Sequence, residues 1–246
     1  MSSDNANILI CRDENAASVE AAERFVCAAV RAVAKRGVFY VAVSGGSTPK
    51  GMYETLASRE FADLVPWTRT EVFFADERCV PPESEESNYR LVNKLLLSTV
   101  PIPESNVHRF HGEDPPEAAA DSYEHEIHRV MDGNPAFDLI ILGMSQDTHT
   151  ASLFPNSPAL REGGKHAAAN YIEKLGAYRL TLTIPAINSA ESVIILAFGE
   201  NKAAALADVL NGPVDIDLHP VQAIRPPHGR LLWIVDQDAA SRLQSA

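Results

Sequence analysis

The chain has 246 residues, of which 46% are hydrophobic and 22% are charged, as in an ordinary soluble protein that buries a sizeable core. Its formal net charge of -12 argues against a general binder of nucleic acid or of anionic membranes, because such binders present clusters of Lys and Arg. The cysteines, at positions 11, 27 and 79, are widely spaced and lack a C-x-x-C pattern, which argues against a disulfide framework or a zinc site and favours a reducing, cytoplasmic location.

Strand-like apolar runs alternate with helix-like segments, which predicts a single α/β domain over residues 1–246 with a mostly parallel sheet flanked by helices. The polar residues 1–7 lack the apolar centre of a signal peptide and are expected to be disordered. No window approaches eighteen apolar residues, so no membrane span is predicted. The pattern leaves the oligomeric state open between a monomer and a weak dimer.

The first long helix is expected to follow the strand "NILICR" and to end at Gly37, a residue suited to a left-handed C-cap. Apolar residues recur there at helical spacing and predict one apolar helical face made of Val19, Ala22, Val26, Ala29, Val30 and Val33. The following run, "VFYVAVS", is typical of a buried strand.

The segment "SGGSTP" lies between this strand and a predicted helix that has Thr48 as its N-cap and the next proline as its first residue. Backbone N–H groups freed by Gly45 and Gly46, together with the hydroxyls of Ser44, Ser47 and Thr48, would form a concave donor site for an anion. The segment matches neither G-x-x-x-x-G-K-[ST] nor G-x-G-x-x-G, so the nucleotide-binding motifs are not met. A tight turn that needs glycine only for its backbone is the alternative.

Polar residues also follow later predicted strands. "TEVFFA" is followed by Asp76, Glu77 and Arg78 and then by the polar loop "VPPESEESN", and "SVIILAF" leads into Lys202 in the first turn of a helix. A lysine there is unfavourable for the helix dipole, which indicates a compensating anion, although a solvated surface lysine is the alternative. Arg179, at the start of "YRLTLT", is either another anion ligand or a strand-end charge.

The strand "FDLIILG" leads into Asp147 and His149, a carboxylate and an imidazole two residues apart. A neutral imidazole can take a proton from water, and a neighbouring carboxylate can fix its tautomer and stabilise the imidazolium that forms. The alternative is a polar turn in which Asp147 caps a helix that begins near Thr150. Ser152 is a poor candidate nucleophile, because "HTASLF" lacks the G-x-S-x-G elbow.

Four other histidines form two H-x-x-H pairs, His108 with His111 and His125 with His128. Their segments are acidic and lack the H-E-x-x-H arrangement, so we expect solvated helix and loop faces. No metal and no cofactor is predicted.

The polar clusters at residues 44–47, 76–78, 147–149 and 199–202 share one feature, since each follows the carboxyl end of a predicted strand. In an open parallel sheet these ends line one crevice, where ligands bind. We therefore expect the four clusters to meet in one site for a small anionic molecule.

Five segments resemble, in order and spacing, those of the 6-phosphogluconolactonases, which share a fold with the glucosamine-6-phosphate isomerases/deaminases. They are "VAVSGGSTPKGMYETLA", "FFADERCVPPESEESNYRLV", "FDLIILGMSQDTHTASLFP", "YRLTLTIPAINSAESVIILAFGENKAAAL" and "PPHGRLLWIVDQDAA". The resemblance implies a Rossmann-like α/β domain and metal-independent hydrolysis of 6-phospho-D-glucono-1,5-lactone to 6-phosphogluconate in the pentose phosphate pathway.

The resemblance also assigns roles to residues. His149 would be the general base that activates water, oriented by Asp147. The phosphate loop and its surroundings would bind the substrate: Ser44, Gly45, Gly46, Ser47, Asp76, Arg78, Arg179 and Lys202.

Two comparisons refine this resemblance. The isomerases/deaminases resemble "DGHIAFNEP" near the histidine, and the glutamate that helps them open the sugar ring is replaced here by Phe154, which favours the lactonase branch. The lactonases commonly read G-x-G-x-D-G-H-T, whereas Ser145 and Thr148 stand here at two of the glycine positions. A β-branched threonine would be strained in a left-handed backbone. The alternatives are a sugar-phosphate-binding protein with impaired catalysis and an amino-sugar-phosphate isomerase/deaminase.

Overall fold

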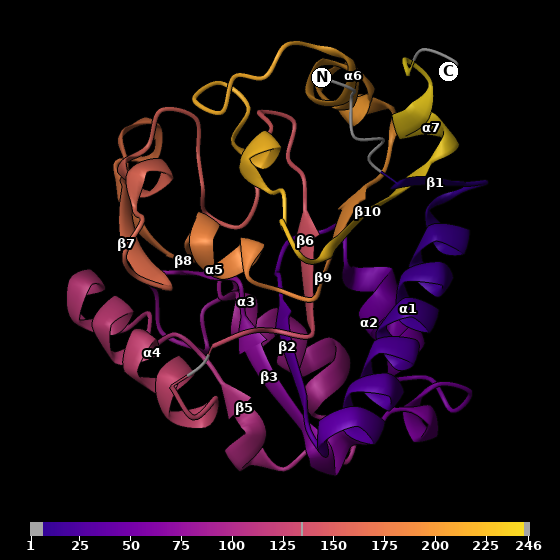
Figure 1. Ribbon diagram of the computed structural model, residues 1–246, viewed down its shortest axis with the longest axis vertical. Helices are drawn as coiled ribbons and strands as arrows, with labels where there is room; N and C mark the ends of the chain where they lie inside the picture. The colour runs from indigo at the N-terminus through magenta and orange to yellow at the C-terminus, as the bar shows by residue number, and fades with distance from the viewer. Residues whose placement is uncertain (1–6, 134, 244–246) are drawn as a thin grey trace.

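The computed structural model describes residues 7–133 and 135–243 (Figure 1). Residues 1–6 of the segment expected to be disordered lie outside this description, whereas Asn7 already belongs to the first strand. Among the described helices, none combines the length and the apolarity that a bilayer-spanning segment requires.

Seven parallel strands form the main sheet, in the order β1-β10-β9-β6-β2-β3-β5. They are β1 (Asn7–Cys11), β2 (Phe39–Val43), β3 (Thr70–Phe74), β5 (Val107–His108), β6 (Leu139–Gly143), β9 (Ser192–Ala197) and β10 (Arg230–Asp236). The predicted α/β class with a mostly parallel sheet is confirmed.

A second, antiparallel sheet has the order β4-β8-β7 and was not foreseen from the sequence. Its strands are β4 (Asp76–Arg78), β7 (Ala167–Ile172) and β8 (Ala177–Leu182). Residues 76–78, which follow β3, pair with β8, about a hundred positions further along the chain.

Helices cover the main sheet and flank the small one. They are α1 (Glu14–Arg36), α2 (Lys50–Leu56), α3 (Asn88–Val92), α4 (Pro116–Val130), α5 (Ile184–Asn188), α6 (Ala203–Asn211) and α7 (Gln237–Ala240). A π-helical turn, Asn93–Leu97, continues α3. In Figure 1, α1 and α2 lie side by side against the main sheet, and α4 lies with β7 and β8 on the other side of the view.

Helix α1 shows how packing refines a sequence pattern. Gly37 ends it in the left-handed conformation, at φ 85°, as predicted. Its buried residues, however, are mostly small: Ala17, Ser18, Ala21, Ala22, Phe25, Ala28, Ala29 and Ala32. The predicted face is confirmed in part: Ala22 and Ala29 are buried and Val26 and Val33 pack against the core, whereas Val19 and Val30 are exposed. Alanines allow close approach of α1 to α2 and the sheet, so their face packs inward despite the greater apolarity of valine.

The order of the strands places a crevice at the centre of the main sheet. β2 and β6 are neighbours there, and the chain continues from β2 outward to β3 but from β6 outward in the opposite direction to β9. Such a reversal leaves space beyond the carboxyl ends of the two central strands, where ligands bind in this class of fold. "SGGSTP" follows β2 directly, and "MSQDTH" follows β6.

Candidate active site

A cavity of about 740 Å³ lies at these carboxyl ends. All ten predicted site residues line it: Ser44, Gly45, Gly46, Ser47, Asp76, Arg78, Asp147, His149, Arg179 and Lys202. Asn88, Lys174 and Leu175 also line it and were missed. Lys174 and Leu175 belong to the turn between β7 and β8, so only a prediction of the small sheet could have pointed to them.

Gly45 and Gly46 are needed in the first loop for different reasons. A Cβ atom on Gly45 would lie 1.9 Å from Oδ1 of Asn88, whereas Gly46 has φ 83°, in the left-handed region. The N–H groups of Gly46, Ser47 and Thr48 donate to no acceptor in the described part of the chain. The loop is therefore both a tight turn that requires glycine and a group of free N–H donors that suits an anion.

Lys202 lies against the same loop. Its Nζ donates to Oγ1 of Thr48 at 2.7 Å, and burial lowers the pKa of Lys202. Two details differ from expectation: α2 begins after Pro49, which replaces Thr48 as the N-cap, and the hydroxyl of Ser44 donates to the carbonyl oxygen of Ile141 at 2.9 Å. Ser44 is thus already satisfied by the sheet, whereas Lys202 contributes an ammonium group to the cavity.

The backbone around Lys202 also differs slightly from the prediction. Lys202 ends a short 3-10 turn, Glu200–Lys202, and serves as the N-cap of α6 rather than lying in its first turn. The side chain still lies at the amino end of the helix, where a positive charge is unfavourable unless an anion binds beside it.

Two arginines form a second cationic group. Arg78 and Arg179 are cross-strand partners in the β4–β8 ladder, and neither pairs with a carboxylate among residues 7–133 and 135–243. Burial, and then the charge of Arg78, lower the pKa of Arg179. Like charges at facing positions repel, so this arrangement favours an anion between them.

The charges of the cavity are opposite in sign to those of the whole chain. Its lining has four basic residues (Arg78, Lys174, Arg179 and Lys202) and two acidic ones (Asp76 and Asp147). The net charge of -12 is therefore compatible with an anionic ligand, because basic residues converge locally.

Asp147 and His149 contact each other directly. The Nδ1 atom of His149 lies 2.5 Å from Oδ1 of Asp147, and this hydrogen bond lowers the pKa of Asp147 to about 2. The Nζ atom of Lys174 lies 3.5 Å from the other carboxylate oxygen. No helix begins near Thr150, so the alternative in which Asp147 is an N-cap is wrong.

The other neighbours hold the dyad and Asp76 in place. The ring of Phe154 stacks on the imidazole of His149, with centroids 4.0 Å apart and planes at 18°. Ser152 donates to Oδ2 of Asp76 at 2.7 Å, and Asn88 donates to Oδ1 at 3.1 Å. The hydroxyl of Ser152 is therefore engaged away from His149, in agreement with its rejection as a nucleophile.

Comparison with known proteins identifies the family. Residues 12–233 match the family described as glucosamine-6-phosphate isomerases/6-phosphogluconolactonase. The chain belongs to this family. A 6-phosphogluconolactonase of Synechocystis sp. is 41% identical over 227 residues, which are 89% of this chain and 92% of that relative. The resemblance read from the five motifs is confirmed.

Solved structures agree with this family. A 6-phosphogluconolactonase from Trypanosoma cruzi, 27% identical, matches with a TM-score of 0.87 over 99% of each chain. A monomeric glucosamine-6-phosphate deaminase, only 19% identical, matches with a TM-score of 0.81 over 96% of this chain and 99% of that chain. The second likeness concerns the fold alone.

One of the two departures from the lactonase motif has a structural consequence. Thr148 has φ 62°, whereas Ser145 does not lie in the left-handed region. Such a backbone costs a non-glycine residue about 1–2 kcal/mol. Contacts with a distant segment hold it: Oγ1 of Thr148 donates to the carbonyl oxygen of Leu218 at 3.1 Å, and the N–H of Val221 donates to the carbonyl oxygen of Thr148 at 3.2 Å. The dyad is assembled despite the threonine.

The expectation for the H-x-x-H pairs is wrong for one histidine. His108 is buried, with Nδ1 2.8 Å from Glu126 and Nε2 2.9 Å from Glu71. Its ring also stacks on Phe73, with centroids 4.5 Å apart. Two side chains of α4 create this environment: Glu126 contacts the ring of His108, and the hydroxyl of Tyr123 donates to its carbonyl oxygen. The acidic sequence around His108 had suggested a solvated position. The other three are at least partly exposed, and His128 contacts Glu124.

Proposed function

We propose that this protein is a 6-phosphogluconolactonase that hydrolyses 6-phospho-D-glucono-1,5-lactone to 6-phospho-D-gluconate in the oxidative pentose phosphate pathway. The reaction requires neither a metal nor a cofactor. The observation that carries the proposal is the presence, in one cavity, of the Asp147–His149 pair beside Arg78, Arg179 and Lys202, which have no carboxylate partner in the described chain. Membership of the family and the names of its relatives support the same activity.

The phosphate of the substrate binds at the "SGGSTP" loop. Free N–H groups of Gly46 and Ser47 and the ammonium of Lys202 supply donors and charge, and Arg179 completes the site from the small sheet. The phosphate lies several bonds from the reacting carbon. Its binding energy therefore orients the lactone for reaction and takes no part in the chemistry itself.

His149 acts as the general base. Its Nδ1–H donates to Asp147, which leaves the lone pair of Nε2 free to accept a proton from water. The oxygen of that water bonds to C1 of the lactone, and negative charge develops on the former carbonyl oxygen, which Arg78 stabilises. The bond between C1 and the ring oxygen then breaks. The imidazolium returns its proton to the ring oxygen, and the new carboxylic acid ionises.

Asp76 and Phe154 define the remaining walls. Asp76, held by Ser152 and Asn88, presents a carboxylate that accepts hydrogen bonds from sugar hydroxyls. Phe154 fixes the orientation of the imidazole and cannot transfer protons. This apolar ring disfavours the ring-opening step of the isomerases/deaminases, for which a titratable group is needed.

The experiment that tests the activity follows freshly prepared 6-phosphogluconolactone with coupled 6-phosphogluconate dehydrogenase, because the lactone also hydrolyses spontaneously. Wild-type protein should accelerate the reaction over buffer, and His149→Ala should lose most of that acceleration while still binding 6-phosphogluconate. Wild-type progress no faster than buffer from folded protein that binds 6-phosphogluconate would instead indicate a sugar-phosphate-binding protein, the alternative that the strained Thr148 favours. Release of ammonia from glucosamine 6-phosphate would indicate an isomerase/deaminase.

The phosphate site has its own test. Lys202→Ala should raise KM for the phosphorylated lactone much more than for unphosphorylated gluconolactone, because only the former loses an ion pair. Lys50→Ala, an exposed lysine that does not line the cavity, is the matched control and should leave both KM values unchanged. Equal effects of Lys202→Ala on both substrates would refute the assignment. A cytoplasmic location and a monomeric or weakly dimeric state, with no nucleic-acid partner, stay predictions.

A further inference from the structure

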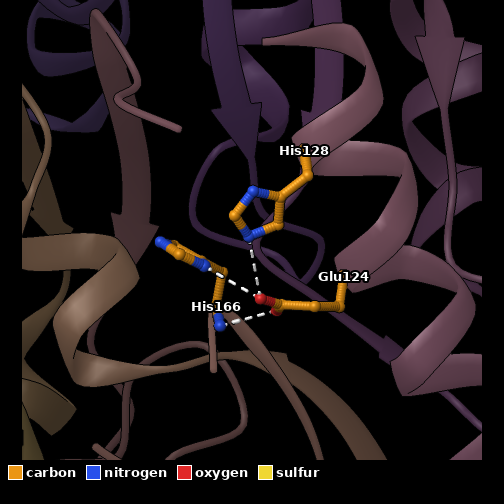
Figure 2. A group of neighbouring side chains, drawn as sticks. All are labelled: Glu124, His128 and His166. Carbon is orange, nitrogen blue, oxygen red and sulfur yellow. Dashed lines mark hydrogen bonds and ion pairs between the residues drawn. The ribbon is translucent and has the colours of Figure 1, made fainter. Parts of the chain in front are cut away.

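A second group of reactive side chains lies outside the cavity, where α4 meets the residue that precedes β7. Figure 2 shows the imidazoles of His128 and His166 directed at the carboxylate of Glu124. Glu124 and His128 lie one helical turn apart on α4, and His166 approaches from the other side. The potential ligand atoms of the three residues lie within 4.8 Å of one another.

We propose that Glu124, His128 and His166 form a binding site for one divalent transition-metal ion of the Zn²⁺ type. Two imidazole nitrogens and one carboxylate oxygen suit Zn²⁺, Co²⁺ or Ni²⁺, whereas Mg²⁺ and Ca²⁺ prefer oxygen ligands. Three protein ligands leave a fourth position for water. The His128 side chain is 40% exposed, so an ion can enter from solvent.

The distances fit this interpretation. Oε1 of Glu124 lies 3.2 Å from Nε2 of His128 and 3.0 Å from Nδ1 of His166. Ligands bound tetrahedrally to zinc at about 2.0–2.1 Å are roughly 3.3 Å from each other. Both pairs of atoms therefore need to separate by only a few tenths of an ångström to admit an ion at their centre.

The backbone of β7 orients the carboxylate. Oε2 of Glu124 accepts hydrogen bonds from the N–H groups of His166, at 2.6 Å, and of Ala167, at 2.8 Å. Oε1 is thereby left facing the two imidazoles. In known metal sites, hydrogen bonds to the ligating side chains orient them in the same way.

The local charges favour a cation at this position. Lys165, the neighbour of His166, pairs with Asp121 at 2.7 Å, and in the described part of the chain no Lys or Arg pairs with Glu124. The net charge of -12 attracts cations to the surface in general. None of the three proposed ligands lines the catalytic cavity, so the inference does not depend on the proposed function.

A bound ion would connect α4 to the small antiparallel sheet. Helix α4 packs on β7, and β7 pairs with β8, which carries Arg179 into the cavity. The ion therefore stabilises a wall of the active site from its outer side, without entering the reaction.

The test uses the full-length protein freed of metal by chelation and dialysis. Isothermal titration with Zn²⁺ near pH 7.5, above the ordinary imidazole pKa of roughly 6.5, should show one ion per chain. His128→Ala, His166→Ala and Glu124→Gln should each weaken binding by at least about tenfold. The control variant is His125→Ala. His125 is exposed on the same helix, and its Nδ1 contacts the carbonyl oxygen of Asp121 at 2.6 Å rather than any of the proposed ligands. Its removal should leave the affinity for Zn²⁺ unchanged.

Two further measurements locate the ion. Co²⁺ should give the visible absorption bands of a tetrahedral site in wild type and His125→Ala but not in His128→Ala. Zn²⁺ should raise the midpoint of thermal unfolding in the same two proteins only. Unchanged affinity in both His128→Ala and His166→Ala would overturn the proposal and indicate an adventitious ion only. Loss of the bound ion in His149→Ala would overturn it too, by placing the ion at the catalytic dyad.

Discussion

The contribution of Asp147 to catalysis can be calculated from the contacts of the dyad. The hydrogen bond from His149 lowers the pKa of Asp147 from 3.8 to about 2, which corresponds to about 2 kcal/mol of interaction with the imidazolium. The Asp147 side chain is 32% exposed, so screening by solvent leaves about 1–2 kcal/mol. Asp147→Asn removes this charge with little change in size. It should therefore lower kcat about 5- to 30-fold, since the imidazolium forms during the reaction.

The coupled lactone assay, corrected for spontaneous hydrolysis, measures this effect as separate values of kcat and KM. KM should change little, because Asp147 is not among the proposed ligands of the phosphate. Lys174→Met is the matched control: its Nζ lies 3.5 Å from the same carboxylate, but its side chain is 74% exposed, so the loss should stay below about fivefold. Wild-type kcat in Asp147→Asn would refute the proposed role of the carboxylate.

Three further predictions concern stability, each measured by urea unfolding. Gly45→Ala should lose about 1–3 kcal/mol, because its Cβ would lie 1.9 Å from the buried Asn88, and unchanged stability would contradict the packing of the loop. The side chain of Arg109 donates to Glu113 at 2.7 and 2.9 Å and lowers the pKa of Glu113 to about 2. The ion pair stabilises the fold by about 1 kcal/mol above pH 4.5, and this contribution is lost as the pH falls toward 2. Glu113→Gln should therefore be less stable than wild type at neutral pH and equally stable near pH 2. Thr148→Gly should have a stability within about 1 kcal/mol of wild type, because relief of backbone strain offsets the lost hydrogen bond. Thr148→Val keeps the strain but loses the hydrogen bond, so it should lose about 1–2 kcal/mol. If the valine variant were the more stable of the two, φ 62° would not be strained.

The sequence by itself determined the α/β class, the turn at Gly37 and the four polar clusters of the cavity. These features depend on short-range physics: the period of apolar residues, the freedom of glycine at positive φ and the rule that parallel strands end at one edge of a sheet. The pairing of Asp147 with His149 belongs to the same class, because residues two positions apart in a loop are close in almost any conformation. Gly46 illustrates the point, since its φ of 83° is a local requirement visible in the motif.

Only the tertiary structure decided which distant side chains face one another. Arg78 and Arg179 become neighbours through an antiparallel ladder between strands about a hundred residues apart, and no local pattern encodes that register. His108 is buried because α4 covers it, although its own segment is acidic. His128 and His166 meet at Glu124 because α4 packs on β7. Long-range contacts depend on how whole faces pack, and packing rewards close fit over the apolarity of individual residues.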